Sequence, residues 1–185
     1  RLPFLPKRIE TLIDETPTSS IEYTYDNNGR LIREDRNGAI TLWEYNQQGR
    51  PTKQTQLTGT DDPDVVTTYT YTPQGYPHKQ ITADAITTLS YDVMGNLLDS
   101  ETRSPAGELL DITHTDYDLR NRPILTYSGS PDKATHIAYH PSGMPKAKWR
   151  GRAYRLYDYD PRGFLITETD PLGTETTYTY DAIGN

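Results

Sequence analysis

The stretch YDPRGFLITETDPLGTETTYTYDAIGN at residues 159–185 decides the fold, because it contains one complete repeat and the start of the next. It opens with Tyr-Asp, passes through a turn that ends at Gly163, and returns to Tyr-Asp at residues 180 and 181. Asp and Pro favour such a bend, and Gly tolerates the positive φ that closes it. Residues 164–169 and 174–180 are expected to be strands, with a second turn at 170–173. A strand about every ten residues, punctuated by Gly and Pro, predicts antiparallel β-structure.

The same pattern occurs eight times along the chain as Tyr, a turn-forming residue, two free positions and Gly or Asn. The spacings between successive motif tyrosines are 20, 26, 20, 26, 22, 20 and 21 residues. Self-similarity at such a period indicates an array of small units, none of which can bury a hydrophobic face alone. The residues that we expect to build the repeated turns are Tyr25, Asp26, Gly29, Tyr45, Gly49, Tyr71, Gly75, Tyr91, Asp92, Gly95, Tyr117, Asp118, Asn121, Tyr139, Gly143, Tyr159, Asp160, Gly163, Tyr180, Asp181 and Gly184.

Three copies depart from the pattern, but their residues are still compatible with the backbone conformation of the turn. Asn121 stands where the other copies have Gly, and Asn is the residue after Gly that best accepts positive φ. Thr72 and His140 stand in the position of Asp, where Thr can still bond its own turn, although more weakly. We therefore expect all eight turns to form.

The repeat also defines the domain organisation. Residues 1–20 are expected to be a partial N-terminal repeat, since Leu5-Pro6 precedes Tyr25 much as Arg50-Pro51 precedes Tyr71. Residues 21–185 are expected to form one continuous array. A chain that begins and ends within a repeat is most simply a fragment of a longer array.

Composition restricts the class of protein. Hydrophobic residues make up 33% of the 185 residues, which is low for a packed globule, but 15 tyrosines and regular Thr-Ile-Leu-Val alternation argue against disorder. The net charge of −7, with no basic stripe, argues against nucleic acid as a partner. The absence of cysteine excludes disulfides and cysteine-based metal sites. No apolar run approaches 18 residues and no targeting signal is recognisable, so no membrane span is expected.

The two edges of the array differ in sequence. The YDxxG turn never lengthens, whereas the turn between repeats grows from DPLG at 170–173 to LTGTDDPDV at 57–65. Variable loops on one side of a repeat protein are the expected contact surface.

The position two residues before the motif tyrosine is large and apolar or aromatic in seven of eight copies. Its occupants are Tyr23, Trp43, Tyr69, Leu89, Thr115, Ile137, Tyr157 and Tyr178. Aromatic residues on consecutive hairpins are expected to stack into a ladder that holds the units together. The alternative is an aromatic strip that binds sugar rings.

These motifs resemble the Rhs, or YD-repeat, family. The copies YDNNGRL (25–31) and YDVMGNL (91–97) and the run at 159–185 carry the resemblance, which covers nearly the whole chain. It implies tandem antiparallel β-hairpins wound into a spiral sheet, which in complete members closes into a hollow shell and in bacterial toxins encloses a toxic C-terminal domain. With about eight units, the chain is expected to form an open, curved all-β sheet of solenoid-like or shell-like character.

Catalytic and metal-binding patterns have simpler explanations in this sequence. Family members with toxins often end in a segment that cleaves itself with paired aspartates near a DPxG motif, but Asp160 and Asp170 both fall on the turn register. His136 and His140 are four apart but lie where a strand runs into a turn, without the glutamate of a zinc motif. We therefore expect no catalytic, cofactor-binding or metal-binding residues.

Two acidic turns raise the question of calcium. A calcium loop that began at Asp26 would need a closing glutamate where Asn37 stands. The acidic loop at 61–64 is exposed, and incidental cation binding remains open there.

The leading hypothesis is structural, not enzymatic. The chain is expected to be part of a bacterial Rhs-type shell, secreted or at the cell surface, that encapsulates and helps deliver a C-terminal toxin domain. Its partners would be the remaining repeats and the toxin cargo, with end-to-end self-association through open sheet edges. The alternative is an extended carbohydrate-binding or protein-binding surface of a secreted or cell-surface protein.

Overall fold

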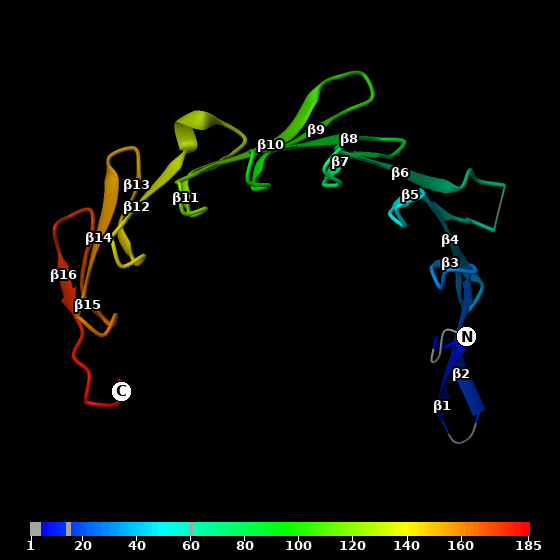
Figure 1. Ribbon diagram of the computed structural model, residues 1–185, viewed down its shortest axis with the longest axis horizontal. Coiled ribbons are helices and arrows are strands. Elements are labelled where there is room, and N and C mark those ends of the chain that lie inside the picture. Colours follow the sequence, from blue (N-terminus) through cyan, green and yellow to red (C-terminus); the bar gives the residue numbers. More distant parts are fainter. Residues whose placement is uncertain (1–4, 14–15, 60) are drawn as a thin grey trace. The chain divides into compact units, whose positions relative to one another are not determined.

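The computed structural model describes residues 5–13, 16–59 and 61–185, and these residues form β-strands connected by turns. The sixteen described strands are β1 (Arg8–Ile13), β2 (Thr16–Tyr25), β3 (Leu31–Arg36), β4 (Ala39–Tyr45), β5 (Pro51–Gln56), β6 (Val65–Tyr71), β7 (Pro77–Ile81), β8 (Ile86–Tyr91), β9 (Leu97–Arg103), β10 (Leu109–Tyr117), β11 (Pro123–Ser128), β12 (Thr135–Tyr139), β13 (Pro145–Arg150), β14 (Ala153–Tyr159), β15 (Leu165–Thr169) and β16 (Glu175–Thr177). One 3₁₀ turn, η1 (Pro131–Lys133), precedes β12. Strand order follows sequence order (Figure 1), which confirms the predicted all-β array of antiparallel hairpins.

The contacts divide the chain into two compact units. The first contains Arg1–Thr88 and Arg103–Glu108, and the second contains Leu89–Thr102 and Leu109–Asn185. In the first unit, β1 to β8 pair with their sequence neighbours in antiparallel register. In the second, β10 to β16 pair in the same way. The predicted boundary between a partial repeat at 1–20 and the array at 21–185 stays a prediction, and residues 1–4 lie outside the described residues.

A β-bulge accompanies the motif tyrosine in repeat after repeat. The register shifts immediately before Tyr25, Tyr45, Tyr71, Tyr117, Tyr139 and Tyr159. Each of these tyrosines then pairs with the first residue of the next strand, as Tyr45 does with Pro51. The extra residue of the bulge lies on the strand after the turn, as Thr52 does between Pro51 and Lys53 of β5.

Neither unit has a conventional hydrophobic core. Among the described residues only Ala134 is buried, at 8% exposure. The accessible surface of the 21.1 kDa chain is 13209 Å², whereas one compact globule of this mass would expose about 9000 Å² and two half-sized globules about 11000 Å². Within each unit the described strands therefore form a single layer, and stability must come from contacts between neighbouring strands.

Candidate functional site

The motif turn is organised by the side chain that follows the tyrosine. In the first copy, Asp26 Oδ1 accepts hydrogen bonds from the backbone N–H groups of Asn28 (2.8 Å) and Arg30 (3.0 Å). The Gly29 N–H donates to the Asp26 carbonyl, and Gly29 lies at φ 78°. The same two side-chain bonds recur at Asn46, Asp92, Asp118, Asp160 and Asp181. The side-chain oxygen of Asp or Asn thus accepts from the N–H groups that the turn leaves without strand partners.

The departures from the motif keep the turn by other means. Asn121 adopts φ 59°, the left-handed conformation that Gly adopts elsewhere. Thr72 Oγ accepts one bond, from the Tyr76 N–H at 3.1 Å. The turn at His140 is closed by backbone bonds with Gly143 and Met144, while its ring contacts the Tyr157 carbonyl at 3.1 Å.

The hydroxyl of the motif tyrosine joins one repeat to the one before it. In at least five repeats it donates to the backbone carbonyl of the residue that follows the preceding turn. The pairs are Tyr25 with Pro6 (3.0 Å), Tyr45 with Leu31 (2.6 Å), Tyr71 with Pro51 (2.7 Å), Tyr139 with Pro123 (2.8 Å) and Tyr180 with Leu165 (3.0 Å). The accepting residue needs only its backbone carbonyl for this bond. Proline, which has a carbonyl but no backbone N–H, can therefore occupy the position, as Pro6, Pro51 and Pro123 do.

Sequence reasoning missed this bond and attributed the role of the tyrosine to stacking. A signal was available, because all eight copies carry Tyr and none carries Phe, which differs only by the hydroxyl. Burial raises the pKa of the Tyr45 and Tyr71 phenols, so these groups stay protonated donors at neutral pH.

A second contact between repeats comes from the residue that follows the motif glycine. The guanidinium groups of Arg30, Arg50 and Arg122 lie 5.1, 5.7 and 4.2 Å from the ring centres of the next motif tyrosines, Tyr45, Tyr71 and Tyr139. In the seventh copy Phe164 replaces the cation and stacks on Tyr180 at 5.0 Å. We call the tyrosine bond and this stacked contact together the inter-repeat seam.

Electrostatics fix the arginine of the seam in place. Arg122 donates to Asp118 Oδ2 from Nη2 at 2.6 Å and from Nε at 2.8 Å, while the same guanidinium lies over Tyr139. The hydrogen bond from the Arg122 side chain lowers the pKa of Asp118 to about 2. A lowered carboxyl pKa stabilises the fold above the ordinary value near 3.9, and this contribution is lost only as the pH falls through about 2.

The predicted aromatic ladder is organised differently from the expectation. Tyr23, Trp43, Tyr69 and Tyr157 are half-buried, but the strand register places them opposite Glu34, Gln54, Gln80 and Glu168, not opposite other aromatic residues. Tyr23 instead stacks on Tyr25 of its own strand, with 6.4 Å between ring centres. The ring contacts seen between repeats in the described residues are made by motif tyrosines, such as Tyr180 with Phe164 and Tyr159 with His140.

The residues considered for metal binding or catalysis have structural partners. His136 stacks on Trp149 with ring centres 5.0 Å apart, and Asp170 accepts the N–H groups of its own turn. Asp64 accepts from the Thr58 N–H within the loop at 57–65. Across the described residues, no group of three or more His, Asp or Glu side chains is placed to hold a metal ion.

A Ser, an Asp and a His come together in the second unit, but their order is not that of a nucleophile triad. Ser90 Oγ donates to Asp99 Oδ2 (2.7 Å), Asp99 Oδ1 contacts His114 Nδ1 (2.6 Å), and His114 Nε2 contacts Asp116 (3.1 Å). A base that activates serine must itself contact the hydroxyl. Here the hydroxyl bonds the carboxylate, so the arrangement does not prepare a nucleophile.

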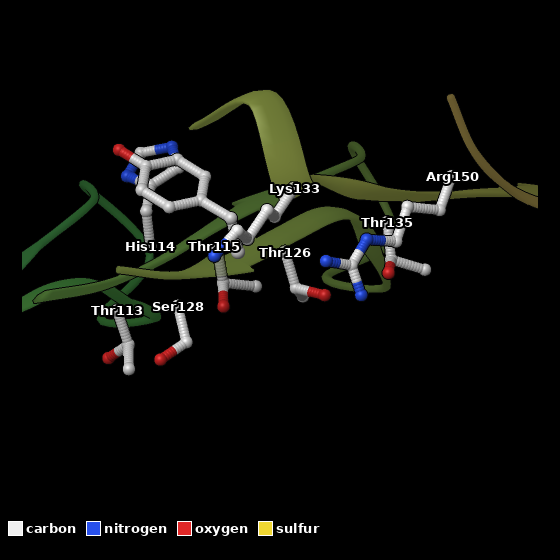
Figure 2. A pocket seen from close by; sticks show the side chains of 9 residues that line it. Thr113, His114, Thr115, Thr126, Ser128, Lys133, Thr135 and Arg150 are labelled. Carbon is white, nitrogen blue, oxygen red and sulfur yellow. The ribbon is translucent and has the colours of Figure 1, made fainter. Parts of the chain in front are cut away.

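An open pocket of about 400 Å³ lies where the pairing of the second unit is short. β11 and β12 share only two paired positions, Leu125 with His136 and Thr126 with Thr135. The chain between the two strands contains η1. Figure 2 shows Lys133 and Arg150 beside the hydroxyl side chains of the pocket. The register places Thr115 and Thr126 on one face and His114 and Tyr127 on the other. Residues of both faces therefore line this gap.

The search for membrane-spanning helices in the described residues found none of sufficient length and apolarity.

The fold and the seam define a β-hairpin repeat protein whose units are joined by tyrosine hydroxyls and stacked cations. The family model described as RHS Repeat matches residues 25–64 and 159–185. The chain therefore contains RHS, or YD, repeats in these two segments, as the motifs indicate, and it has a structural repeat role. The comparison with curated proteins gave no match.

Solved structures share the fold. A crystal structure of TcdB2-TccC3-Cdc42 matches 95% of this chain with a TM-score of 0.72 and 16% identity, and TcdB2-TccC3 without its hypervariable C-terminal region matches 96% with the same score and identity. A Photorhabdus luminescens Tc holotoxin pore with a mutated TccC3 matches 88% with a TM-score of 0.70 and 16% identity. The chain spans 10–11% of the length of these chains.

Proposed function

We propose that this chain is a wall segment of a shell that encloses a C-terminal toxin domain of its parent protein and helps to deliver it. The observation that carries the proposal is the inter-repeat seam, which recurs along the array and joins each unit to the previous one. A single layer of strands covers a larger area with a given number of residues than a fold of two or more packed layers. The Tc toxin structures support the proposal by sharing this fold.

The proposed location follows from the proposed role. A wall around a toxin would act outside the producing cell, so we place the protein among secreted or surface-exposed bacterial proteins. Its partners would be the other repeats of the parent and the toxin cargo. End-to-end association through sheet edges stays a prediction.

Electron microscopy of the full-length parent protein tests the encapsulation. We expect a closed hollow shell with density inside, and a parent that lacks the proposed C-terminal cargo should form the same shell without that density. An array that encloses nothing would contradict the proposal. It would favour the alternative, in which loops such as 57–65 form a recognition surface for carbohydrate or protein.

We also propose that the array itself is not an enzyme. The Ser90, Asp99 and His114 cluster has the wrong connectivity for catalysis, which supports this view. The 185-residue chain should show no turnover above background on esterase, glycosidase and peptidase substrates. Reproducible turnover that the substitution Ser90→Ala abolishes would contradict it.

A further inference from the structure

His114 is held between two carboxylates in the second unit. Its Nδ1 lies 2.6 Å from Asp99 Oδ1 on β9, and its Nε2 lies 3.1 Å from Asp116 Oδ1 on its own strand, β10. Asp99 is in turn fixed by the Ser90 hydroxyl on β8 at 2.7 Å. The ring also stacks on Tyr127 of β11, with ring centres 5.1 Å apart. The imidazole therefore connects four successive strands.

Two ionised carboxylates at the two ring nitrogens favour a charged imidazole. A carboxylate oxygen can only accept hydrogen bonds, so both ring nitrogens of His114 must donate. Only the imidazolium has two N–H groups, whereas neutral histidine has one donor and one lone pair. Loss of the proton would leave one nitrogen lone pair facing a carboxylate and would remove the positive charge between Asp99 and Asp116.

Charges on the surrounding elements are mixed, but the direct contacts are acidic. Asp99 comes from β9, where Glu101 shares its face by strand alternation. Lys133 of η1 and Arg150 of β13 line the pocket that His114 also lines, and both interact with Asp132. The hydrogen bond with Asp99 is the largest influence on His114 and raises its pKa, with further contributions from the charges of Asp116 and Asp99.

We propose that His114 is a proton-controlled clamp that holds β8, β9 and β10 together when the imidazole is charged and loosens their packing when it becomes neutral. The device is specific to the fifth repeat. The equivalent position, three residues before the motif tyrosine, is Glu22, Leu42, Thr68, Thr88, His136, Leu156 or Thr177 in the other copies. Of these, His136 stacks on Trp149 instead of bridging carboxylates.

The pH range in which the clamp is closed follows from the raised pKa of His114 and the lowered pKa of Asp99. The pKa of His114 is raised in the fold, so its contribution is complete below the ordinary value of about 6.5 and is lost as the pH rises through the raised value. The bond from Ser90 is the main cause that lowers the pKa of Asp99, so its contribution is present above about 3.9 and is lost on further acidification. The clamp is strongest between these limits.

A titration of the unmodified chain tests the proposal directly. The Cε1–Hε1 signal of each histidine is followed by NMR from about pH 5 to about pH 9, a range that brackets the ordinary histidine pKa. His114 should titrate above the ordinary histidine pKa of about 6.5. Amide hydrogen exchange in β9 and β10, corrected for the intrinsic effect of pH, should accelerate several-fold as His114 loses its proton.

Matched variants separate the clamp from a general effect of pH. His114→Gln removes the titration, so exchange in β9 and β10 should lose its dependence on pH across this range, whereas His136→Gln should retain it. Titration of His114 at or below the ordinary histidine pKa of about 6.5 would overturn the proposal, as would unchanged pH dependence in His114→Gln. If His114→Gln fails to fold, the titration of the unmodified chain decides alone.

Discussion

Tyr139→Ala is expected to destabilise its repeat by about 2–3 kcal/mol, the larger part of what an aromatic-to-alanine change costs in a full core. The substitution removes the hydroxyl bond to the Pro123 carbonyl (2.8 Å) and the ring over which Arg122 lies at 4.2 Å. It also exposes an arginine that Asp118 holds in place. Denaturant unfolding combined with amide hydrogen exchange measures the loss.

Tyr139→Phe is the matched control for this prediction. It keeps the ring under Arg122 and removes only the hydroxyl, so its expected cost is about 1 kcal/mol. The damage in both variants should concentrate in β11 to β13, because a repeat contacts chiefly its neighbours. Equal costs for Phe and Ala would show that the stacked contact contributes nothing. A uniform loss of protection along the chain would contradict the local character of the seam.

Gly75→Ala is expected to cost about 1.5–3 kcal/mol, of which about 1–2 kcal/mol is backbone strain at positive φ. Gly75 lies at φ 92°, where a side chain is strained whatever the available space. An added Cβ would also clash with Nη2 of Arg50, so the guanidinium must leave its place over the Tyr71 ring. Losing that cation–π contact adds about 0.5–1 kcal/mol. Equilibrium unfolding of the variant measures the sum.

Gly107→Ala is the matched control, because it introduces the backbone strain without a clash with an arginine side chain. Gly107 has nearly the same φ, 89°, and an added Cβ there would meet nothing within 4 Å. In an Arg50→Ala background, Gly75→Ala should cost no more than Gly107→Ala, because the obstructing side chain is gone. If Gly75→Ala and Gly107→Ala are equal in the unmodified background, the close approach of Arg50 has no energetic weight.

The turns could be predicted well because their chemistry is local. Asp26, Asp92 and Asp118 lie within four residues of every N–H group that they bind, so the motif alone contains donor and acceptor. The positive φ of Asn121 follows from its place in the same motif. The strands were predictable for a related reason, since Gly and Pro mark their ends and the period of the repeat sets their spacing.

The seam could not be derived in the same way, because its partners come from different repeats. The Tyr71 hydroxyl and the Pro51 carbonyl are 20 residues apart, and the register between β5 and β6 decides which carbonyl the ring reaches. The aromatic residues at Tyr23 and Trp43 misled the expectation for a similar reason. Their identity suggested a ladder, but the register sets polar residues opposite them.

By itself, the sequence determined the class of fold, the number of repeated turns and the residues that build them, because each turn is closed by groups that are neighbours in the chain. Only the tertiary structure decided what joins one repeat to the next and what His114 contacts. Those contacts depend on strand register, and register is a property of two strands together. The sequence of a single repeat contains a tyrosine, an arginine and a carbonyl, but it does not show that the tyrosine contacts the arginine and the carbonyl of the previous repeat.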